Sequence, residues 1–216
     1  MIITQTVESY SRVAQIIARG GVIAFRTDTF YGLGADPFNR DAVQRIKHLK
    51  GREDHKPILI VLSDPAVVTR FIAEPGTTFE ILAEKFWPGP LTLVGQAVSD
   101  LPEEITVGTK TIGVRLPGDD RVRALVQVCG GALTATSANP SHEEPARTAQ
   151  KVFSYFGKEI DLIVDDGDAV TEQPSTVVDV CEVEPRLIRE GVIKWSTIQI
   201  ELDKPGVRRI ETLNGT

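Results

Sequence analysis

The sequence has little cysteine, because only Cys129 and Cys181 occur among its 216 residues. They lie far apart with no histidine nearby at metal-ligand spacing, so the pattern predicts neither a disulfide framework nor a zinc site. We expect both to be small buried apolar residues. No apolar run approaches the roughly 20 residues of a membrane span, and Met1–Thr4 lacks the basic start and apolar core of a signal peptide. The composition therefore predicts a cytoplasmic protein without membrane contact.

The chain also lacks an excess of basic residues, since its formal net charge is −6. Nonspecific affinity for nucleic acid comes mostly from Lys and Arg that neutralise phosphates, so this balance argues against a protein that coats nucleic acid. It leaves a local basic pocket possible. A chain of 216 residues with 41% hydrophobic and 25% charged residues suits one compact α/β domain, or one domain with a short extension.

Helical and strand patterns alternate along the chain, with no internal repeat and no low-complexity tract. Strands are predicted at Val22–Phe25, Pro57–Leu62, Leu91–Val94, Thr111–Leu116, Ala132–Ala135, Leu162–Val164 and Thr176–Val180. Helices are predicted at Val7–Arg19, from Asn39 to His48, from Asp64 toward Phe71, and at Thr77–Phe86, Asp119–Cys129 and Thr148–Phe156. The segment after Gly191 is mixed and polar, and it is treated as an extension without assigned structure.

The stretch "RTDTFYGLGA", Arg26 to Ala35, follows the first predicted strand directly. Small hydroxyl residues and glycines at the end of a strand let the main chain approach a ligand closely, because glycine has no Cβ. The stretch is therefore interpreted as a binding loop. An ordinary polar turn before the helix near Asn39 is the alternative, and the stretch alone favours it.

Basic residues gather in "LKGREDHKPILIVL", where Lys50, Arg52 and Lys56 connect a helix to a buried strand. Arg offers a planar fork and Lys a compact charge, so cations at a strand entry suit phosphate or carboxylate capture. A solvated loop is the alternative, and clusters of charged residues usually belong to solvated loops.

Polar residues also stand at or within several predicted strands. Ser137 and Asn139 follow one strand in "GALTATSANPS", where their hydroxyl and amide groups either orient a small polar substrate or form an ordinary Asn-Pro turn. Arg115 falls inside a strand pattern, where a charge needs a partner or a ligand. Ser175 precedes one strand, and Arg189 ends another.

Common nucleotide and hydrolase signatures are missing. The sequence contains no GxxxxGK[ST], GxSxG or HExxH, and Gly32-Leu33-Gly34 is followed by Pro37 where a dinucleotide fingerprint needs glycine. Any nucleotide site must therefore use another type of loop.

Seven motifs in order, "TDTFYGLG", "KGR" with "KPI", "FWPGPLT", "VRLP", "TSANPS", "STVVD" and "LIREG", resemble the YrdC-like family of threonylcarbamoyl-AMP synthases. The resemblance runs from about Gly21 to about Gly191. It implies a single α/β domain, with a twisted mixed sheet and flanking helices around a deep, positively charged cavity. We expect the catalytic domain at residues 1–195 and a C-terminal extension at residues 196–216, with no room for the second domain of the family's long form.

The resemblance also implies an activity. The enzyme would condense L-threonine, bicarbonate and ATP into threonylcarbamoyl-adenylate and pyrophosphate, with Mg²⁺ bound to ATP. A partner threonylcarbamoyl transferase complex would then modify the tRNA adenosine next to the anticodon, so this chain would contact tRNA only weakly or indirectly. Carried over by motif, the catalytic residues are Lys50, Arg52, Ser137 and Asn139. The threonine-binding residues are Thr29, Arg115 and Ser175, the ATP-binding residues are Arg52, Lys56, Ser137 and Arg189, and no protein ligand for a metal is identified.

Three positions depart from the family pattern: Arg26 and Glu53 replace prolines, and His142 replaces a glycine. Two other functions remain as alternatives. One is a noncatalytic RNA-binding module of the same fold, which the acidic charge and the lack of an aromatic and basic stripe disfavour. The other is the related carbamoyltransferase domain of hydrogenase maturation, which the absence of CxxC pairs disfavours.

Overall fold

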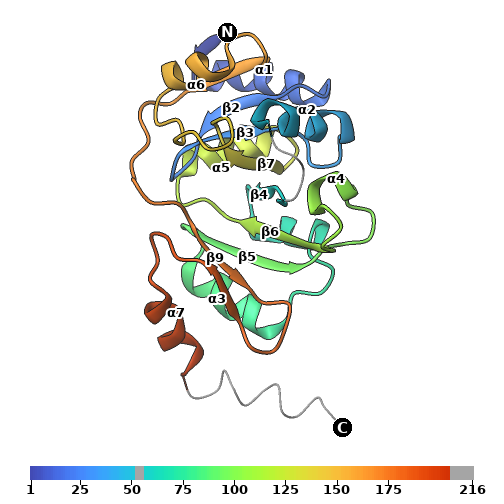
Figure 1. Ribbon diagram of the computed structural model, residues 1–216, viewed down its shortest axis with the longest axis vertical. Helices are drawn as coiled ribbons and strands as arrows, with labels where there is room; N and C mark the ends of the chain where they lie inside the picture. Colours follow the sequence, from blue (N-terminus) through green and yellow to red (C-terminus); the bar gives the residue numbers. More distant parts are fainter. Residues whose placement is uncertain (52–55, 205–216) are drawn as a thin grey trace.

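A mixed β-sheet forms the centre of the computed structural model, which describes residues 1–51 and 56–204. Within these residues ten strands follow the order β1-β8-β2-β3-β7-β4-β6-β5-β9-β10 (Figure 1). The pairs β1/β8, β2/β8, β4/β6 and β5/β9 are parallel, and the other pairs are antiparallel. This arrangement confirms the predicted α/β fold with a mixed sheet.

The strands are β1 (Ile2–Thr4), β2 (Ile23–Arg26), β3 (Tyr31–Gly34), β4 (Leu59–Leu62), β5 (Leu91–Gln96), β6 (Thr111–Arg115), β7 (Ala132–Ser137), β8 (Leu162–Asp165), β9 (Thr176–Asp179) and β10 (Arg186–Arg189). The helices are α1 (Val7–Ala18), α2 (Arg40–Lys50), the 3-10 helix η1 (Pro65–Arg70), α3 (Thr77–Phe86), α4 (Glu103–Thr106), α5 (Asp120–Val128), α6 (Ala149–Phe156) and α7 (Trp195–Leu202).

Helix α2 shows how local sequence sets an element's limits. The Asn39 side chain accepts a hydrogen bond from the Ala42 amide and so caps the first turn, as predicted. The helix ends at Gly51, whose φ of 62° is left-handed and favours glycine. Lys50 therefore occupies the last helical residue, immediately before the chain turns toward β4.

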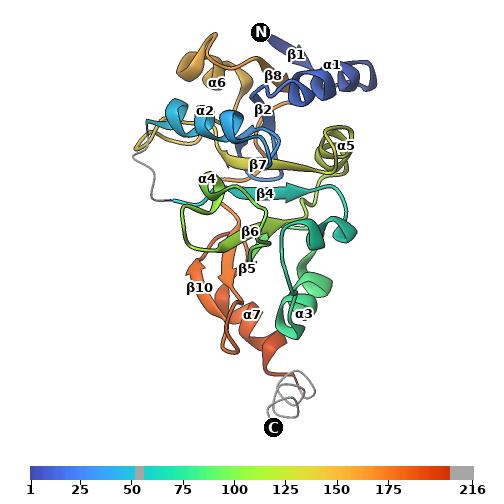
Figure 2. The same ribbon diagram turned by 90° about the vertical axis from the view of Figure 1, so that its right-hand side faces the viewer.

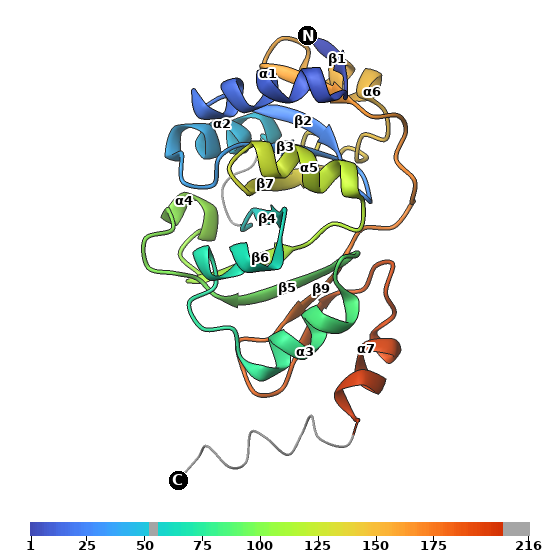
Figure 3. The same ribbon diagram turned by 180° about the vertical axis from the view of Figure 1, so that it is seen from behind.

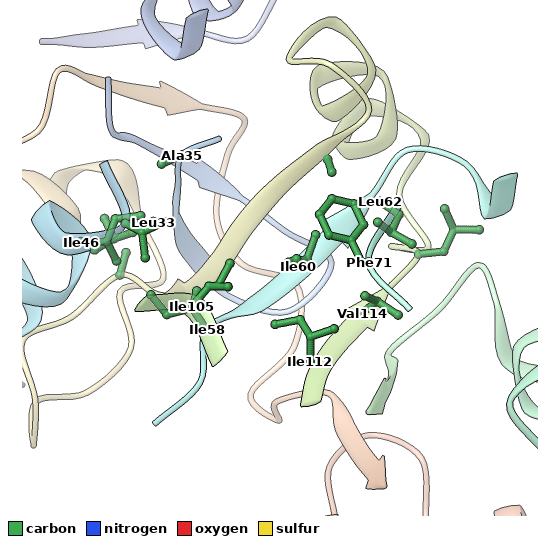
Figure 4. Packing of buried hydrophobic residues seen from close by; sticks show 14 of the residues in the cluster. Leu33, Ala35, Ile46, Ile58, Ile60, Leu62, Phe71, Ile105, Ile112 and Val114 are labelled. Atoms are coloured by element: carbon green, nitrogen blue, oxygen red, sulfur yellow. The ribbon is translucent and has the colours of Figure 1, made fainter. Parts of the chain in front are cut away.

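Apolar side chains form two core clusters on opposite faces of the sheet. Helices α1 and α5 contact each other and cover one cluster, and Figure 3 shows both from that side. Side chains alternate along β4, so Val61 belongs to the cluster under α1 and α5, while Ile60 and Leu62 belong to the larger cluster on the opposite face. Figure 4 shows Ile60, Leu62 and Phe71 packed with residues of β6 in the larger cluster.

The structure corrects the prediction for the stretch from Arg26 to Ala35. Tyr31–Gly34 is strand β3, which pairs antiparallel with β2, so only residues 27–30 form a loop. Glycine suits this strand because a Cβ on Gly34 would lie 2.6 Å from the Phe25 ring. The binding-loop interpretation therefore applies to the tip of a β-hairpin.

Other differences are local. No sequence pattern predicts β1, α4 or α7, and Ser137, predicted to follow a strand, is the last residue of β7. The predicted boundary between residues 195 and 196 falls after the first residue of α7, which packs against α3 (Figure 2). Cys129 and Cys181 are half-buried rather than buried. Among the described residues, no helix has the length and apolar character that crossing a bilayer requires.

Candidate functional site

A cavity of about 790 Å³ opens where the β2–β3 hairpin loop faces β6 and the β9–β10 pair. Thr27 and Thr29 line it from the hairpin, Arg115 from β6, Ser137 from the end of β7, and Ser175 from the start of β9. These residues are far apart in sequence, and the sheet brings them together because each stands at or near a strand end. Phe30 and Tyr31 of the hairpin line the cavity as well.

Thr29 is 6% exposed and held in place by its own loop. Its backbone amide donates to the Thr27 hydroxyl at 3.1 Å, and the two hydroxyl oxygens are 3.0 Å apart. Thr27 also donates from its hydroxyl to the carbonyl oxygen of Phe30. This internal bonding fixes the loop tip, so the hydroxyl of Thr29 has a defined position at the cavity surface.

Arg115 is the main buried cation of the cavity, with 5% exposure. Its Nη2 lies 3.2 Å from Oδ1 of Asp28, and its Nη1 lies 3.5 Å from the Thr29 hydroxyl. Burial lowers the pKa of Arg115, and the Asp28 charge opposes that effect. A bound anion would stabilise a guanidinium in this environment, because it would replace the hydration that the guanidinium loses on burial.

A second cation, Arg189, approaches the same cavity from β10. Its Nε and Nη2 donate to the Ser175 carbonyl oxygen at 3.2 and 3.0 Å, and Nη2 lies 3.2 Å from the Ser175 hydroxyl. Arg189 is exposed as a whole residue, but partial burial of its guanidinium and the positive charge of Arg115 both lower its pKa. Two cations that repel each other across a cavity favour a ligand with negative charge between them.

The charged residues among the described lining are Lys56, Arg115, Arg186, Arg189 and Asp179, which gives four cations and one carboxylate. Lys56 is exposed at the rim, where α2 leads into β4. Arg186 already has a partner, because its Nη2 lies 3.0 Å from Oδ2 of Asp179. The excess of positive charge agrees with a site for anionic ligands.

Lys50 lies behind this cavity and is 1% exposed. Its ammonium donates to the carbonyl oxygens of Ser137 and Asn139, the latter at 2.9 Å, and it lies 3.4 Å from Oδ1 of Asn139. The Asn139 amide nitrogen donates to the carbonyl oxygens of Pro140 and Glu143. Lys50 and Asn139 are not among the described residues that line the cavity. Lys50 of the KGR motif and Asn139 of the TSANPS motif therefore contact each other, and together they hold the turn after β7.

Arg52 and Glu53 lie outside the described residues. His142, at the position where the family pattern has glycine, has a φ of 73°, in the left-handed region that glycine favours. Arg26, the third departure, forms ion pairs with Asp119 and Asp166, each at 2.7 Å.

Sequence reasoning missed several residues of the site. Asp28 is the counterion of Arg115, and its Oδ2 accepts a hydrogen bond from the Gly118 amide. Thr111 and Gly113 line the cavity together with Arg115 because alternate residues of β6 share one face. Strand alternation would have found these two, starting from Arg115.

Within the described residues, no group of three or more His, Cys, Asp or Glu side chains could hold a metal ion.

The chain is therefore an α/β protein whose mixed sheet carries a cavity with four cations and one carboxylate among its described lining residues. The family described as "Telomere recombination", Sua5/YciO/YrdC, matches residues 15–191. The chain belongs to this family, which confirms the resemblance given by its motifs.

Curated relatives in this family carry an enzyme name. The threonylcarbamoyl-AMP synthase of Halorhodospira halophila is 36% identical over 163 residues, which are 76% of this chain and 85% of that protein. The threonylcarbamoyl-AMP synthase of Pyrococcus abyssi is 35% identical over 186 residues, which are 86% of this chain and 55% of that protein.

A solved structure has the same fold. The crystal structure of P. abyssi Sua5 complexed with L-threonine superposes with a TM-score of 0.89 at 32% identity, covering 94% of this chain and 60% of that one. This chain therefore spans about three fifths of that protein's length.

Proposed function

We propose that this chain is a threonylcarbamoyl-AMP synthase, which condenses L-threonine, bicarbonate and ATP into threonylcarbamoyl-adenylate and pyrophosphate. The observation that carries the proposal is the convergence of Thr29, Arg115, Ser175 and Arg189 on one cavity. The enzyme names of the relatives and the L-threonine in the P. abyssi structure support the choice of substrate.

The reaction has two bond-forming steps. The threonine amine attacks the carbon of bicarbonate and water leaves, which gives an N-carboxylate. An oxygen of this carboxylate then attacks the α-phosphorus of ATP, and pyrophosphate leaves. Both steps concentrate negative charge, so fixed cations stabilise the transition states more than a protein nucleophile would.

The cavity residues fit separate parts of these substrates. In the proposed arrangement Arg115 pairs with the threonine carboxylate, while Thr29 and Ser175 orient the amino acid. Arg189 and Lys56 face the phosphates of ATP, which enters with Mg²⁺ as part of the substrate. Ser137 contacts the nucleotide from the end of β7, on a turn that Lys50 and Asn139 hold. Arg52 is proposed as a phosphate ligand on the strength of its motif alone.

The direct test measures pyrophosphate release from MgATP with L-threonine and bicarbonate, and identifies the adenylate by mass. We expect release to require both co-substrates and no RNA. A bicarbonate-depleted buffer and L-lysine in place of L-threonine serve as controls. The same rate of release without threonine would remove the main support for the synthase.

The RNA-binding alternative makes a different prediction. Because the chain has a net charge of −6, we expect weak tRNA affinity near physiological salt. A titration of labelled tRNA at two salt concentrations measures it. Tight binding that resists salt, without adenylate formation, would favour the module.

The transfer of the product to tRNA by a partner transferase remains a proposal that follows from the synthase reaction.

A further inference from the structure

The loop that carries Thr29 is held at its base by the paired residues Arg26 and Tyr31, which end β2 and begin β3. Both side chains reach the segment of residues 165–167, which begins at the last residue of β8. The position of the hairpin tip therefore depends on contacts that lie outside the cavity.

Arg26 makes the charged part of this attachment. Its Nη2 lies 2.7 Å from Oδ2 of Asp119 and 2.7 Å from Oδ2 of Asp166. The Arg26 side chain is 9% exposed and that of Asp166 is 1% exposed. Asp119 caps α5 through the Arg121 amide, and Arg121 also pairs with Asp166. One guanidinium thus ties the hairpin to α5 and to the segment after β8.

Tyr31 makes the second part of the attachment. Its hydroxyl donates to the Gly167 carbonyl oxygen at 2.8 Å and lies 3.2 Å from Oδ1 of Asp165. The Gly167 amide donates to the same Oδ1 at 3.0 Å, which orders the receiving segment. The two residues at the base of the loop therefore contact consecutive residues of one segment.

A buried ion pair of this kind adds little net stability, because desolvation of the charges offsets most of their attraction. Its geometric effect is larger, since two carboxylates from different elements fix the guanidinium from two directions. We propose that Arg26 is a positioning residue for the threonine subsite: it sets the place of the Thr29 hydroxyl relative to Arg115. This inference rests on the proposed function and assigns a role to a position where the family pattern has proline.

The proposal predicts a selective effect. The hairpin carries Thr29, whereas Lys56 and Thr111 line other parts of the cavity and lie outside the hairpin. Loosening the hairpin base should raise KM for L-threonine about ten- to a hundredfold, because small misplacements of a substrate-orienting group have effects of this size. KM for ATP should change by less than about threefold.

The test compares Arg26→Met, Arg26→Lys and Tyr31→Phe in the full chain. Lysine reaches one carboxylate at a time, so we expect KM for L-threonine in Arg26→Lys to lie between the values for wild type and Arg26→Met. Tyr31→Phe removes one hydroxyl and no charge, so it remains informative if Arg26→Met does not fold. Arg45→Met is the matched control, because it breaks an exposed arginine pair with Asp161 away from the cavity.

Hydrogen exchange provides a readout that does not depend on turnover. The Thr29 amide bonds within the loop, so its exchange should be faster in Arg26→Met and Tyr31→Phe and unchanged in Arg45→Met. Equal changes in both KM values, or unchanged exchange at Thr29, would overturn the proposal. If the wild-type protein forms no adenylate, the proposed function fails, while the exchange measurement still decides whether Arg26 holds the loop.

Discussion

Two buried cations, Lys50 and Arg115, differ in what surrounds them. Lys50 directs its ammonium at fixed carbonyl oxygens of Ser137 and Asn139. Arg115 faces a cavity with Asp28 as its carboxylate partner at 3.2 Å, and it shares that cavity with Arg189. A cation bonded to the backbone holds the fold, whereas cations that repel each other across a cavity favour an anionic ligand. We therefore expect Lys50 and Arg115 to have different roles, although both are basic and buried.

The largest effect should come from Arg189→Met. Loss of one preorganised cation costs roughly 2–4 kcal/mol of transition-state stabilisation, which corresponds to a rate loss of about 30- to 1000-fold. The free energy of unfolding should change by less than about 1 kcal/mol, because the loss of hydrogen bonds to Ser175 is offset by relief of repulsion from Arg115. Adenylate formation and urea unfolding measure the two quantities.

Arg186→Met is the matched control for this prediction. Arg186 is on the same strand, its side chain is 76% exposed, and it already pairs with Asp179. We expect its turnover to stay within about threefold of wild type, since exposed pairs contribute little. Equal losses in both variants would mean that the cavity responds to total charge rather than to Arg189.

Lys50→Met should mainly reduce stability, in contrast to Arg189→Met, which should mainly reduce turnover. The ammonium's hydrogen bonds to buried carbonyl oxygens would be lost, so we expect about 2–3 kcal/mol less free energy of unfolding. Lys85→Met, which removes a lysine with a 51% exposed side chain from its pair with Glu201, should cost less than about 1 kcal/mol. A Lys50→Met protein of wild-type stability that had lost turnover would contradict the structural role and place Lys50 with the catalytic cations.

The smallest effect is predicted at His142, in the turn that Lys50 holds. A non-glycine residue at φ 73° carries roughly 1–2 kcal/mol of strain. Glycine removes this strain, but it loses more conformational entropy on folding, which offsets part of the gain. His142→Gly should therefore stabilise the protein by about 0.5–1 kcal/mol without changing turnover, whereas His142→Ala should give no gain. Thermal unfolding of the two variants separates backbone strain from loss of the imidazole.

Long apolar patterns made most of the fold predictable. β4 and β5 are runs of branched and apolar residues with buried side chains, and α2 has a cap at Asn39. β3 was missed because Gly32 and Gly34 read as loop residues, although Gly34 provides space for the Phe25 ring. β1 has three residues, too few for a periodic signal, and depends on its parallel pairing with β8.

The motifs indicated several residues that line the cavity, whereas the directions of the side chains came only from the structure. Thr29, Arg115 and Ser175 converge on one cavity because strand ends meet there, and their motifs indicated this. The sequence does not give the direction in which a side chain points, so it could not separate Lys50, directed at carbonyl oxygens, from Arg115, directed at the cavity. Asp28 was missed because only the folded hairpin brings it to Arg115.

We expect the Arg115 side of the cavity to bind the amino acid. Calorimetric titration of L-threonine into wild type and Arg115→Gln tests it most directly, with urea unfolding to establish that the variant is folded. Loss of a charge-assisted pair weakens binding by roughly 1.5–3 kcal/mol, so we expect the dissociation constant to rise about tenfold or more. A folded Arg115→Gln protein that binds L-threonine as tightly as wild type would contradict the account.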